Sequence, residues 1–143
     1  MALDFLSPLH KASRQIKLYL ESLTREVGVS PIEGHLLTYL HSYAPAPISE
    51  LVQVFGIKQS TFTSMIDRLE NAGLIRREIN PDDRRSFLIH ITDEGRSVAT
   101  RINEFLTTFE QEVREQIDAR DLEGYHAVME AIESVTQVQL RER

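Results

Sequence analysis

The chain has 143 residues, of which 41% are hydrophobic, and this length favours one buried core in a single domain. Its formal net charge is -6 and it contains no cysteine, which excludes a disulfide framework, a thiolate-rich zinc site and redox sensing through a thiol. We find no run of ~18 apolar residues and no basic, apolar leader sequence. We therefore expect a cytoplasmic protein that does not enter a membrane.

The charge is distributed unevenly along the chain. From Asp93 to Glu133, eleven acidic residues stand against four basic ones, as expected for solvated helical faces. From Gly56 to His90 the stretch is nearly neutral, with five acidic and six basic residues. A DNA-binding protein needs Lys and Arg at its phosphate contacts. The basic side chains lie where such contacts are expected, at Lys58, Arg68, Arg76, Arg77, Arg84 and Arg85.

The first third of the chain predicts two helices. Apolar residues at helical spacing indicate a first helix that ends near Gly28, carrying Leu9, Ile16, Leu20, Leu23 and Val27. Ser30 and Glu33 form a capping-box pattern around Pro31, which predicts the start of a second helix. The prolines at positions 45 and 47 end that helix, and a short linker follows.

A helix-turn-helix pattern follows the linker. We predict a short helix from Ser49 to Phe55, a tight turn at positions 56–57 and a longer helix from Gln59 to Asn71, which ends at Gly73. The longer helix buries one face with Phe62, Met65, Ile66 and Leu69. Its other positions are rich in short side chains that form hydrogen bonds.

The last half of the chain predicts a β-hairpin and two further helices. Alternating apolar residues on both sides of a turn at positions 80–83 indicate the hairpin, over residues 74–91. Thr92 caps a long helix that carries Val98, Ile102, Phe105, Phe109, Val113 and Ile117. The last helix starts at about Asp121 and carries Leu122, Tyr125, Val128, Ile132, Val135 and Leu140.

Two helices followed by a hairpin form a winged-helix arrangement, which suits DNA. A helix about 10 Å wide fits the major groove, about 12 Å wide, and a two-stranded ribbon can carry an arginine into the minor groove. The turn ends in Arg84 and Arg85, at the most exposed point of the hairpin. Two alternatives remain open: a compact fold used for protein contacts, and a solvated turn with a local Asp–Arg pair of little energy.

Three segments of the chain resemble the MarR family of transcription regulators: residues 60–77 (STFTSMIDRLENAGLIRR), 80–85 (NPDDRR) and 89–95 (IHITDEG). The resemblance covers nearly the whole chain, because that family also has helices before and after a winged core. It implies an obligate dimer through the first and last helices, a recognition helix in the major groove and a wing arginine in the minor groove.

The resemblance also implies roles for individual residues. Arg85 matches the arginine of the minor groove, Asp83 matches the aspartate that braces it, and residues 59–64 match the turn that reads bases. Many relatives have a longer basic side chain where Ser64 stands, and Lys58 is a poor helix cap. The full set of predicted DNA contacts is Gln59, Ser60, Thr61, Thr63, Ser64, Arg68, Arg77, Asp83, Arg84 and Arg85.

Regulators of the MarR family usually respond to small aromatic or phenolic molecules, and one polar aromatic stripe on the second helix is a candidate wall of such a site. His35, Tyr39 and Tyr43 lie four residues apart. The alternative is interface packing with satisfied polar tips. The scattered histidines do not predict a metal site, and no cofactor or enzymatic motif is present.

We therefore expect a mainly α fold with a small β wing. Residues 30–92 form the winged helix-turn-helix core, and residues 1–29 and 93–143 form terminal dimerisation helices, because their apolar stripes exceed what one small core can cover. The expected function is a ligand-responsive repressor that binds a pseudo-palindromic double-stranded DNA operator as a homodimer. The alternative is a winged-helix module that binds protein and not DNA.

Overall fold

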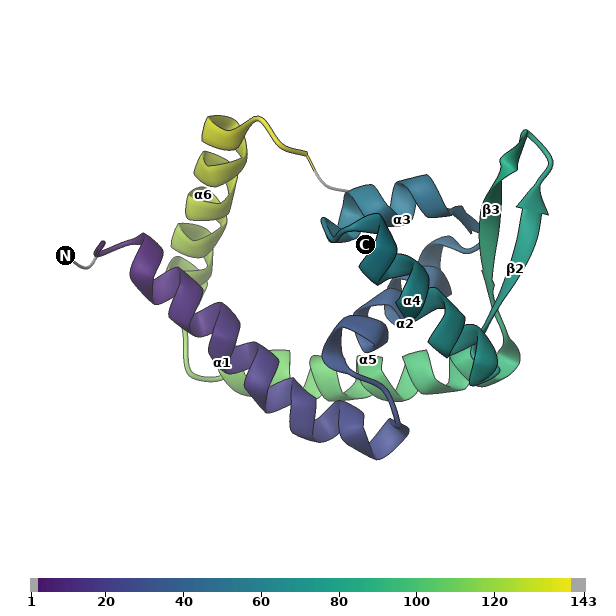
Figure 1. Ribbon diagram of the computed structural model, residues 1–143. Coiled ribbons are helices and arrows are strands. Elements are labelled where there is room, and N and C mark those ends of the chain that lie inside the picture. Colours follow the sequence, from purple (N-terminus) through teal and green to yellow (C-terminus); the bar gives the residue numbers. More distant parts are fainter. Residues whose placement is uncertain (1–2, 140–143) are drawn as a thin grey trace. The chain divides into compact units, whose positions relative to one another are not determined.

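The structure is a computed structural model that describes residues 3–139 of the chain (Figure 1). It contains two compact units, Met1–Asn103 and Glu104–Arg143, and the division falls inside helix α5 (Asp93–Arg114). The first unit holds four helices and a small sheet that precede α5, and the second unit holds the end of α5 and helix α6 (Ala119–Thr136).

The first helix ends, and the second begins and ends, where the sequence predicts. Helix α1 (Leu6–Thr24) continues as one 3-10 turn, η1 (Arg25–Val27), and stops at Gly28, which has a left-handed φ of 77°. Helix α2 (Pro31–Tyr43) starts with the predicted capping box. The backbone N–H of Glu33 donates to Ser30 Oγ at 3.3 Å, and the backbone N–H of Ser30 donates to Glu33 Oε1 at 2.9 Å. Both reciprocal bonds satisfy free N–H groups of the first turn.

The helix-turn-helix lies where the sequence predicts it. Helix α3 (Ile48–Phe55) ends at Gly56, and helix α4 (Gln59–Asn71) follows and closes near Gly73, which has a left-handed φ of 77°. The α4 side chains at i, i+4 and i+7 face the core and are fully buried, at Phe62, Ile66 and Leu69. This burial determines which face of α4 remains exposed.

The hairpin belongs to a sheet of three strands rather than two. Strands β2 (Ile75–Asn80) and β3 (Asp83–Ile91) pair antiparallel, and β1 (Ala46–Pro47) pairs with the other edge of β3, giving the order β1-β3-β2. The sequence predicts only a helix end and a short linker here, so β1 is an addition to the predicted elements. Two residues are too few for a periodic signal, so only the contact with β3 defines this strand.

The core of the first unit brings together α2, α3, α4, the sheet and the start of α5. Its fully buried side chains come from all of these elements and include Leu36, Leu37, Leu40, Leu51, Ile66, Leu69 and Ile89. Thr92 caps α5, because its Oγ1 accepts a hydrogen bond from the backbone N–H of Gly95 at 3.0 Å. The hairpin and α4 therefore stand on one shared hydrophobic base.

The boundaries of the last helices differ from the prediction. Helix α5 ends at Arg114, so Ile117 lies outside it. Helix α6 begins at Ala119, earlier than predicted, because Asp118 and Asp121 form a second capping box. Leu140 lies outside the described residues. Within α6, whose residues are all described, none is buried.

The terminal helices expose many large apolar side chains. In α1, Thr24 is the one buried residue, whereas Leu6, Ile16, Leu18 and Tyr19 are exposed. In the second unit, exposed apolar residues occur at Val113, Ile117, Tyr125, Val135 and Val138. Apolar surface of this extent on a small chain is typical of a protein-protein interface.

Candidate nucleic-acid interface

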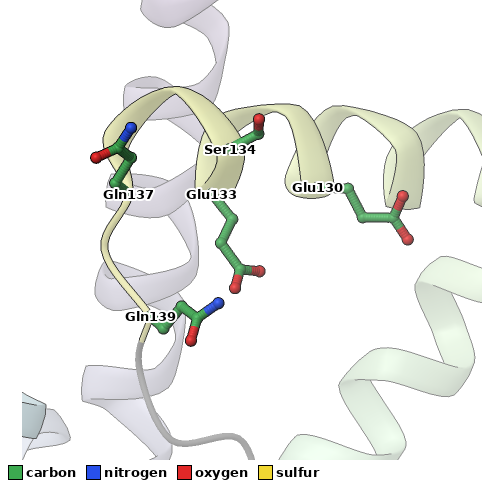
Figure 2. Close-up of a pocket in the computed structure, with 5 residues that line it drawn as sticks. All are labelled: Glu130, Glu133, Ser134, Gln137 and Gln139. Atoms are coloured by element: carbon green, nitrogen blue, oxygen red, sulfur yellow. The ribbon is translucent and has the colours of Figure 1, made fainter.

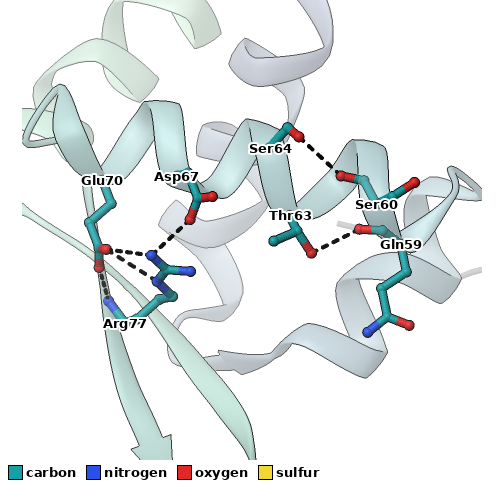
Figure 3. A network of polar contacts seen from close by, with 7 residues as sticks. All are labelled: Gln59, Ser60, Thr63, Ser64, Asp67, Glu70 and Arg77. Carbon is teal, nitrogen blue, oxygen red and sulfur yellow. Dashed lines mark hydrogen bonds and ion pairs between the residues drawn. The ribbon is translucent and has the colours of Figure 1, made fainter.

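The first half of α4 presents a polar, exposed surface. Gln59, Ser60, Thr61, Thr63 and Ser64 are all exposed, because the apolar positions of the helix face the core. Thr63 Oγ1 donates to the Gln59 carbonyl at 2.9 Å, and Ser64 Oγ donates to the Ser60 carbonyl at 3.2 Å (Figure 3). These two hydroxyls keep their oxygen lone pairs available, so they can accept hydrogen bonds from cytosine N4 or adenine N6 in a major groove.

The start of α4 has no side-chain cap. Lys58 occupies the N-cap position, and its side chain makes no capping hydrogen bond. The helix nevertheless begins at Gln59, where the sequence predicts it. Uncapped backbone N–H groups and the positive end of the helix dipole are favourable for a nearby anion such as a phosphate.

A braced arginine lies at the start of β3, directly after the turn between β2 and β3. Asp83 Oδ1 accepts a hydrogen bond from the backbone N–H of Arg85 at 3.1 Å and lies 3.6 Å from Arg85 Nε. The Arg85 side chain is 94% exposed. Arg84 is exposed beside it, and the Asn80 side chain closes the turn by accepting from the backbone N–H of Asp82. The wing therefore projects two cations into solvent.

Arg68 bonds to a buried acid of helix α2. Its Nη2 donates to Glu33 Oε2, and the Glu33 side chain is only 5% exposed. From the sequence, Arg68 was predicted to contact DNA, and Glu33 was predicted to act only in the capping box. Thirty-five residues separate the two positions, so no local pattern could have indicated the pair.

Arg77 is held by two acids of helix α4. Its Nε and Nη2 donate to Glu70 Oε1 at 3.1 and 2.9 Å, its backbone N–H donates to Glu70 Oε2 at 2.8 Å, and Nη2 lies 2.8 Å from Asp67 Oδ1 (Figure 3). The backbone and side-chain hydrogen bonds from Arg77 lower the pKa of Glu70, because they stabilise its ionised form. The guanidinium also lies over the ring of Phe87.

The polar aromatic stripe of α2 packs against helix α3. His35 makes an edge contact with Phe55, Tyr39 contacts both Tyr43 and Phe55, and Phe55 continues the cluster to Phe62 of α4. Tyr39 is buried, and among the described residues its hydroxyl has no hydrogen-bond partner. The stripe is therefore part of an aromatic cluster between α2, α3 and α4.

Two surface hollows lack the positive charge that a DNA site needs. A hollow of about 460 Å³ on the second unit is lined by the end of α6, with Glu130, Glu133, Ser134, Gln137 and Gln139 (Figure 2). Its carboxylates repel an anion. A hollow of about 370 Å³ on the first unit lies at the junction of α1 and α2, where Arg25, Glu21, Glu33 and Arg68 contribute both signs of charge.

The described residues contain neither a membrane-spanning helix nor a cluster of metal ligands. Among residues 3–139, no helix is long and apolar enough to cross a membrane. In the same residues, no three side chains of His, Asp or Glu come together as a metal ion would require.

A helix-turn-helix followed by a hairpin with an exposed, basic tip defines a winged helix-turn-helix protein. The sequence model of the MarR family matches residues 12–87. The chain belongs to the MarR family.

Two curated relatives have related sequences. The transcriptional repressor MdtR of Bacillus subtilis is 38% identical over 76 residues, which are 53% of this chain and 48% of MdtR. The transcriptional regulator PecS of Dickeya dadantii is 36% identical over 103 residues, which are 69% of this chain and 61% of PecS. The match thus spans less than two thirds of either relative.

Solved structures have the same fold at lower identity. The S. aureus MepR-DNA complex superposes with a TM-score of 0.85 at 18% identity, covering 94% of this chain and 99% of that chain. The MarR family transcription regulator SP03579 superposes with a TM-score of 0.84 at 23% identity, covering 92% and 87%. These similarities confirm the predicted mainly α fold with a small β wing.

Proposed function

We propose that the protein is a transcription regulator that binds double-stranded DNA as a homodimer at a pseudo-palindromic operator. The observation that carries this proposal is the exposed, braced Arg85 at the wing tip, beside a recognition helix with a polar outer face. The curated relative MdtR is named a repressor, and MepR has been solved with DNA, which supports the assignment. The action that we propose is repression in the cytoplasm.

The proposed contacts divide into two groups. Helix α4 enters the major groove and reads base edges with Gln59, Ser60, Thr61, Thr63 and Ser64. The wing reaches the minor groove with Arg84 and Arg85, and Asp83 braces Arg85 through a hydrogen bond from its backbone N–H and an ion pair with its guanidinium. Sequence specificity comes from the first group, and affinity for any duplex comes mainly from the second.

The proposed dimer forms through the terminal segments, residues 1–29 and 93–143. The exposed apolar side chains of α1 and α6 support this assignment, because neither helix has more than one buried residue. Covering them with a second copy removes apolar surface from water. Sedimentation at micromolar concentration is expected to give a dimer, and a stable folded monomer would contradict the arrangement with two half-sites.

A small aromatic or phenolic effector is the proposed signal, with His35, Tyr39 and Tyr43 at its site. The phenol of Tyr39 has no hydrogen-bond partner among the described residues, so a polar group of a ligand would satisfy it. The close ring contacts of Tyr39 favour the alternative of packing. Thermal shift with salicylate as the probe separates the two: His35→Ala lowers the shift only if the ligand lies there.

The DNA-binding proposal is tested by fluorescence anisotropy with a random duplex over a series of salt concentrations. Wild-type affinity is expected to fall steeply as salt rises, because binding releases counterions from phosphates. Arg85→Ala is expected to weaken binding, and the matched control Arg101→Ala, which removes an exposed charge from α5, is not. Negligible binding at low salt would favour a winged-helix module that binds protein instead.

A further inference from the structure

Two arginines of the winged core are neutralised by acids of the protein itself. Arg68 pairs with Glu33 of α2, and Arg77 pairs with Glu70 and Asp67 of α4. We call these contacts the α4 ion pairs. Because each cation already faces at least one carboxylate, the pairs add no net positive charge to the surface that would face DNA.

The first of these pairs fixes α4 to the start of α2. Glu33 is a buried carboxylate whose two oxygens bond to different elements, Oε1 to the backbone N–H of Ser30 and Oε2 to Arg68. A buried charge is tolerated only when it is paired and hydrogen-bonded in this way. Arg68 also lines the hollow at the junction of α1 and α2, so its side chain lies toward that junction.

The second pair fixes α4 to the wing. Glu70 receives both the backbone N–H and the guanidinium of Arg77 from strand β2, and Asp67 adds a further contact one turn earlier (Figure 3). Positions 68 and 70 are about 200° apart around a helix. The two pairs therefore hold opposite sides of α4, one against α2 and the other against β2.

We propose that Arg68 and Arg77 are positioning residues that set the orientation of α4, and that they are not phosphate contacts. The buried apolar face of α4 selects the side of the helix that stays exposed, and the ion pairs add directional contacts on its two flanks. Ion pairs on both sides of the helix fix its rotation, and rotation decides which bases Thr61 and Ser64 meet. The assignment rests on the proposed DNA binding.

The test uses two charge-neutral double variants, Glu33→Gln with Arg68→Gln and Glu70→Gln with Arg77→Gln. Each removes one cation and one anion, so the net charge of the chain does not change. Binding of the full-length variants is measured by fluorescence anisotropy on two duplexes of equal length, over a series of salt concentrations. One is an operator selected by the wild-type protein from a random library, and the other is a scrambled duplex.

Positioning residues and phosphate contacts give different results. We expect each double variant to lose about tenfold in affinity for the selected operator, to change by less than about twofold on the scrambled duplex and to keep the wild-type salt slope. The control Arg84→Gln, at the wing tip, is expected to lower the salt slope by roughly one per half-site. A double variant that lowers the slope as Arg84→Gln does would overturn the proposal.

Thermal unfolding tests the Arg68–Glu33 pair without DNA. Thermal unfolding of Arg68→Gln is expected to show a lower midpoint than the wild type, because Glu33 is left buried and unpaired, and adding Glu33→Gln is expected to recover part of the loss. If the stability lost in the double variant equals the sum of the losses in Arg68→Gln and Glu33→Gln, the two side chains do not stabilise each other and the pair does not hold α4. If the wild-type chain binds neither duplex, the proposed function is wrong. The unfolding midpoints of the wild type, the two single variants and the double variant still show whether Arg68 and Glu33 stabilise each other.

Discussion

One carboxylate oxygen of Asp83 contacts Arg85 twice: it accepts a hydrogen bond from the backbone N–H at 3.1 Å and lies 3.6 Å from Nε as an ion pair. The first contact joins the two residues at the start of β3, and the second restricts the arginine side chain, which is otherwise in solvent. An exposed ion pair of this kind contributes little to stability, at most about 1 kcal/mol. The pair matters instead because it restricts the orientation of the Arg85 side chain.

Substitution of either residue is expected to weaken DNA binding. Arg85→Ala removes a cation from the minor groove and is expected to cost roughly 1–3 kcal/mol per half-site on any sequence, with a lower salt slope. Asp83→Ala has two opposed effects. Loss of a negative charge near phosphates favours binding, whereas loss of the contact that orients Arg85 weakens it, and we expect the weakening to be larger. Anisotropy at two salt concentrations separates these effects, and tighter binding by Asp83→Ala with Arg85→Ala unchanged would mean that the wing stays outside the DNA.

Substitutions on the exposed face of α4 are expected to act on specificity. Thr61→Ala and Ser64→Ala remove oxygens that can accept from base amino groups, so they are expected to cost about 1–3 kcal/mol on the selected operator and little on a scrambled duplex. The measurement is the ratio of the two affinities for each variant. An equal loss on both duplexes would show that these side chains contact the phosphate backbone instead.

Removal of the Tyr39 hydroxyl is expected to leave the protein at least as stable. The hydroxyl is buried, and no described residue bonds to it, so Tyr39→Phe relieves an unsatisfied polar group while keeping the ring contacts. Tyr39→Ala instead leaves a cavity and is expected to cost about 3–5 kcal/mol. Chemical denaturation compares the two, and a large loss of stability for Tyr39→Phe would show that the hydroxyl has a hydrogen-bond partner in solution.

Acid is expected to remove the stability that Glu70 contributes. Hydrogen bonds from Arg77 lower the pKa of Glu70 below its ordinary 4.5, so the contribution is complete above that pH and is lost as the pH falls through the lowered value. The free energy of unfolding of the wild type is thus expected to be about 1 kcal/mol higher than that of Glu70→Gln at pH 7 and equal to it in acid. The control Glu110→Gln, at an exposed pair, is expected to match the wild type throughout; a difference between wild type and Glu70→Gln that persists unchanged in acid would contradict this account.

The sequence predicted the elements of the winged core well because local chemistry determines them. The capping box at Ser30, the glycines at 56 and 73 and the spacing of Phe62, Ile66 and Leu69 each act over a few residues. The end of α5 and the start of α6 differ from the prediction, because the capping box of Asp118 and Asp121 starts α6 at Ala119. That box follows the same rule as the first, so the signal was present in the sequence.

The partners of the arginines were not predictable in the same way. Arg68 and Arg77 stood out as cations in a basic stretch, but their acidic partners Glu33 and Glu70 come together only when α2, α4 and β2 pack. Strand β1 has the same origin, since Ala46 and Pro47 are a strand only against β3. Sequence periodicity indicates which face of a helix or strand is buried. The ion pairs and strand β1 depend instead on which helices and strands pack together.

Gly95, in the first turn of α5, packs closely against the residues that flank the wing, Leu74 before β2 and Ile91 at the end of β3. A Cβ added there would lie 2.0 Å from the carbonyl oxygen of Leu74 and 2.8 Å from Ile91 Cγ1, so the backbone itself would have to move. That same carbonyl accepts the backbone N–H of Thr92 at 3.1 Å, which joins the end of β3 to the start of β2. Any shift of the carbonyl therefore strains this junction.

Gly95→Ala is accordingly expected to destabilise the protein by about 3 kcal/mol, at the upper end of the usual cost of overpacking. Gly124→Ala is the matched control, because Gly124 lies inside α6 with no neighbouring atom within 4 Å of the added Cβ. Alanine has the higher helix propensity, so this control is expected to gain about 0.5–1 kcal/mol. Thermal unfolding of both variants measures the difference. Equal midpoints for Gly95→Ala and the wild type would mean that the close approach at Leu74 does not exist in solution.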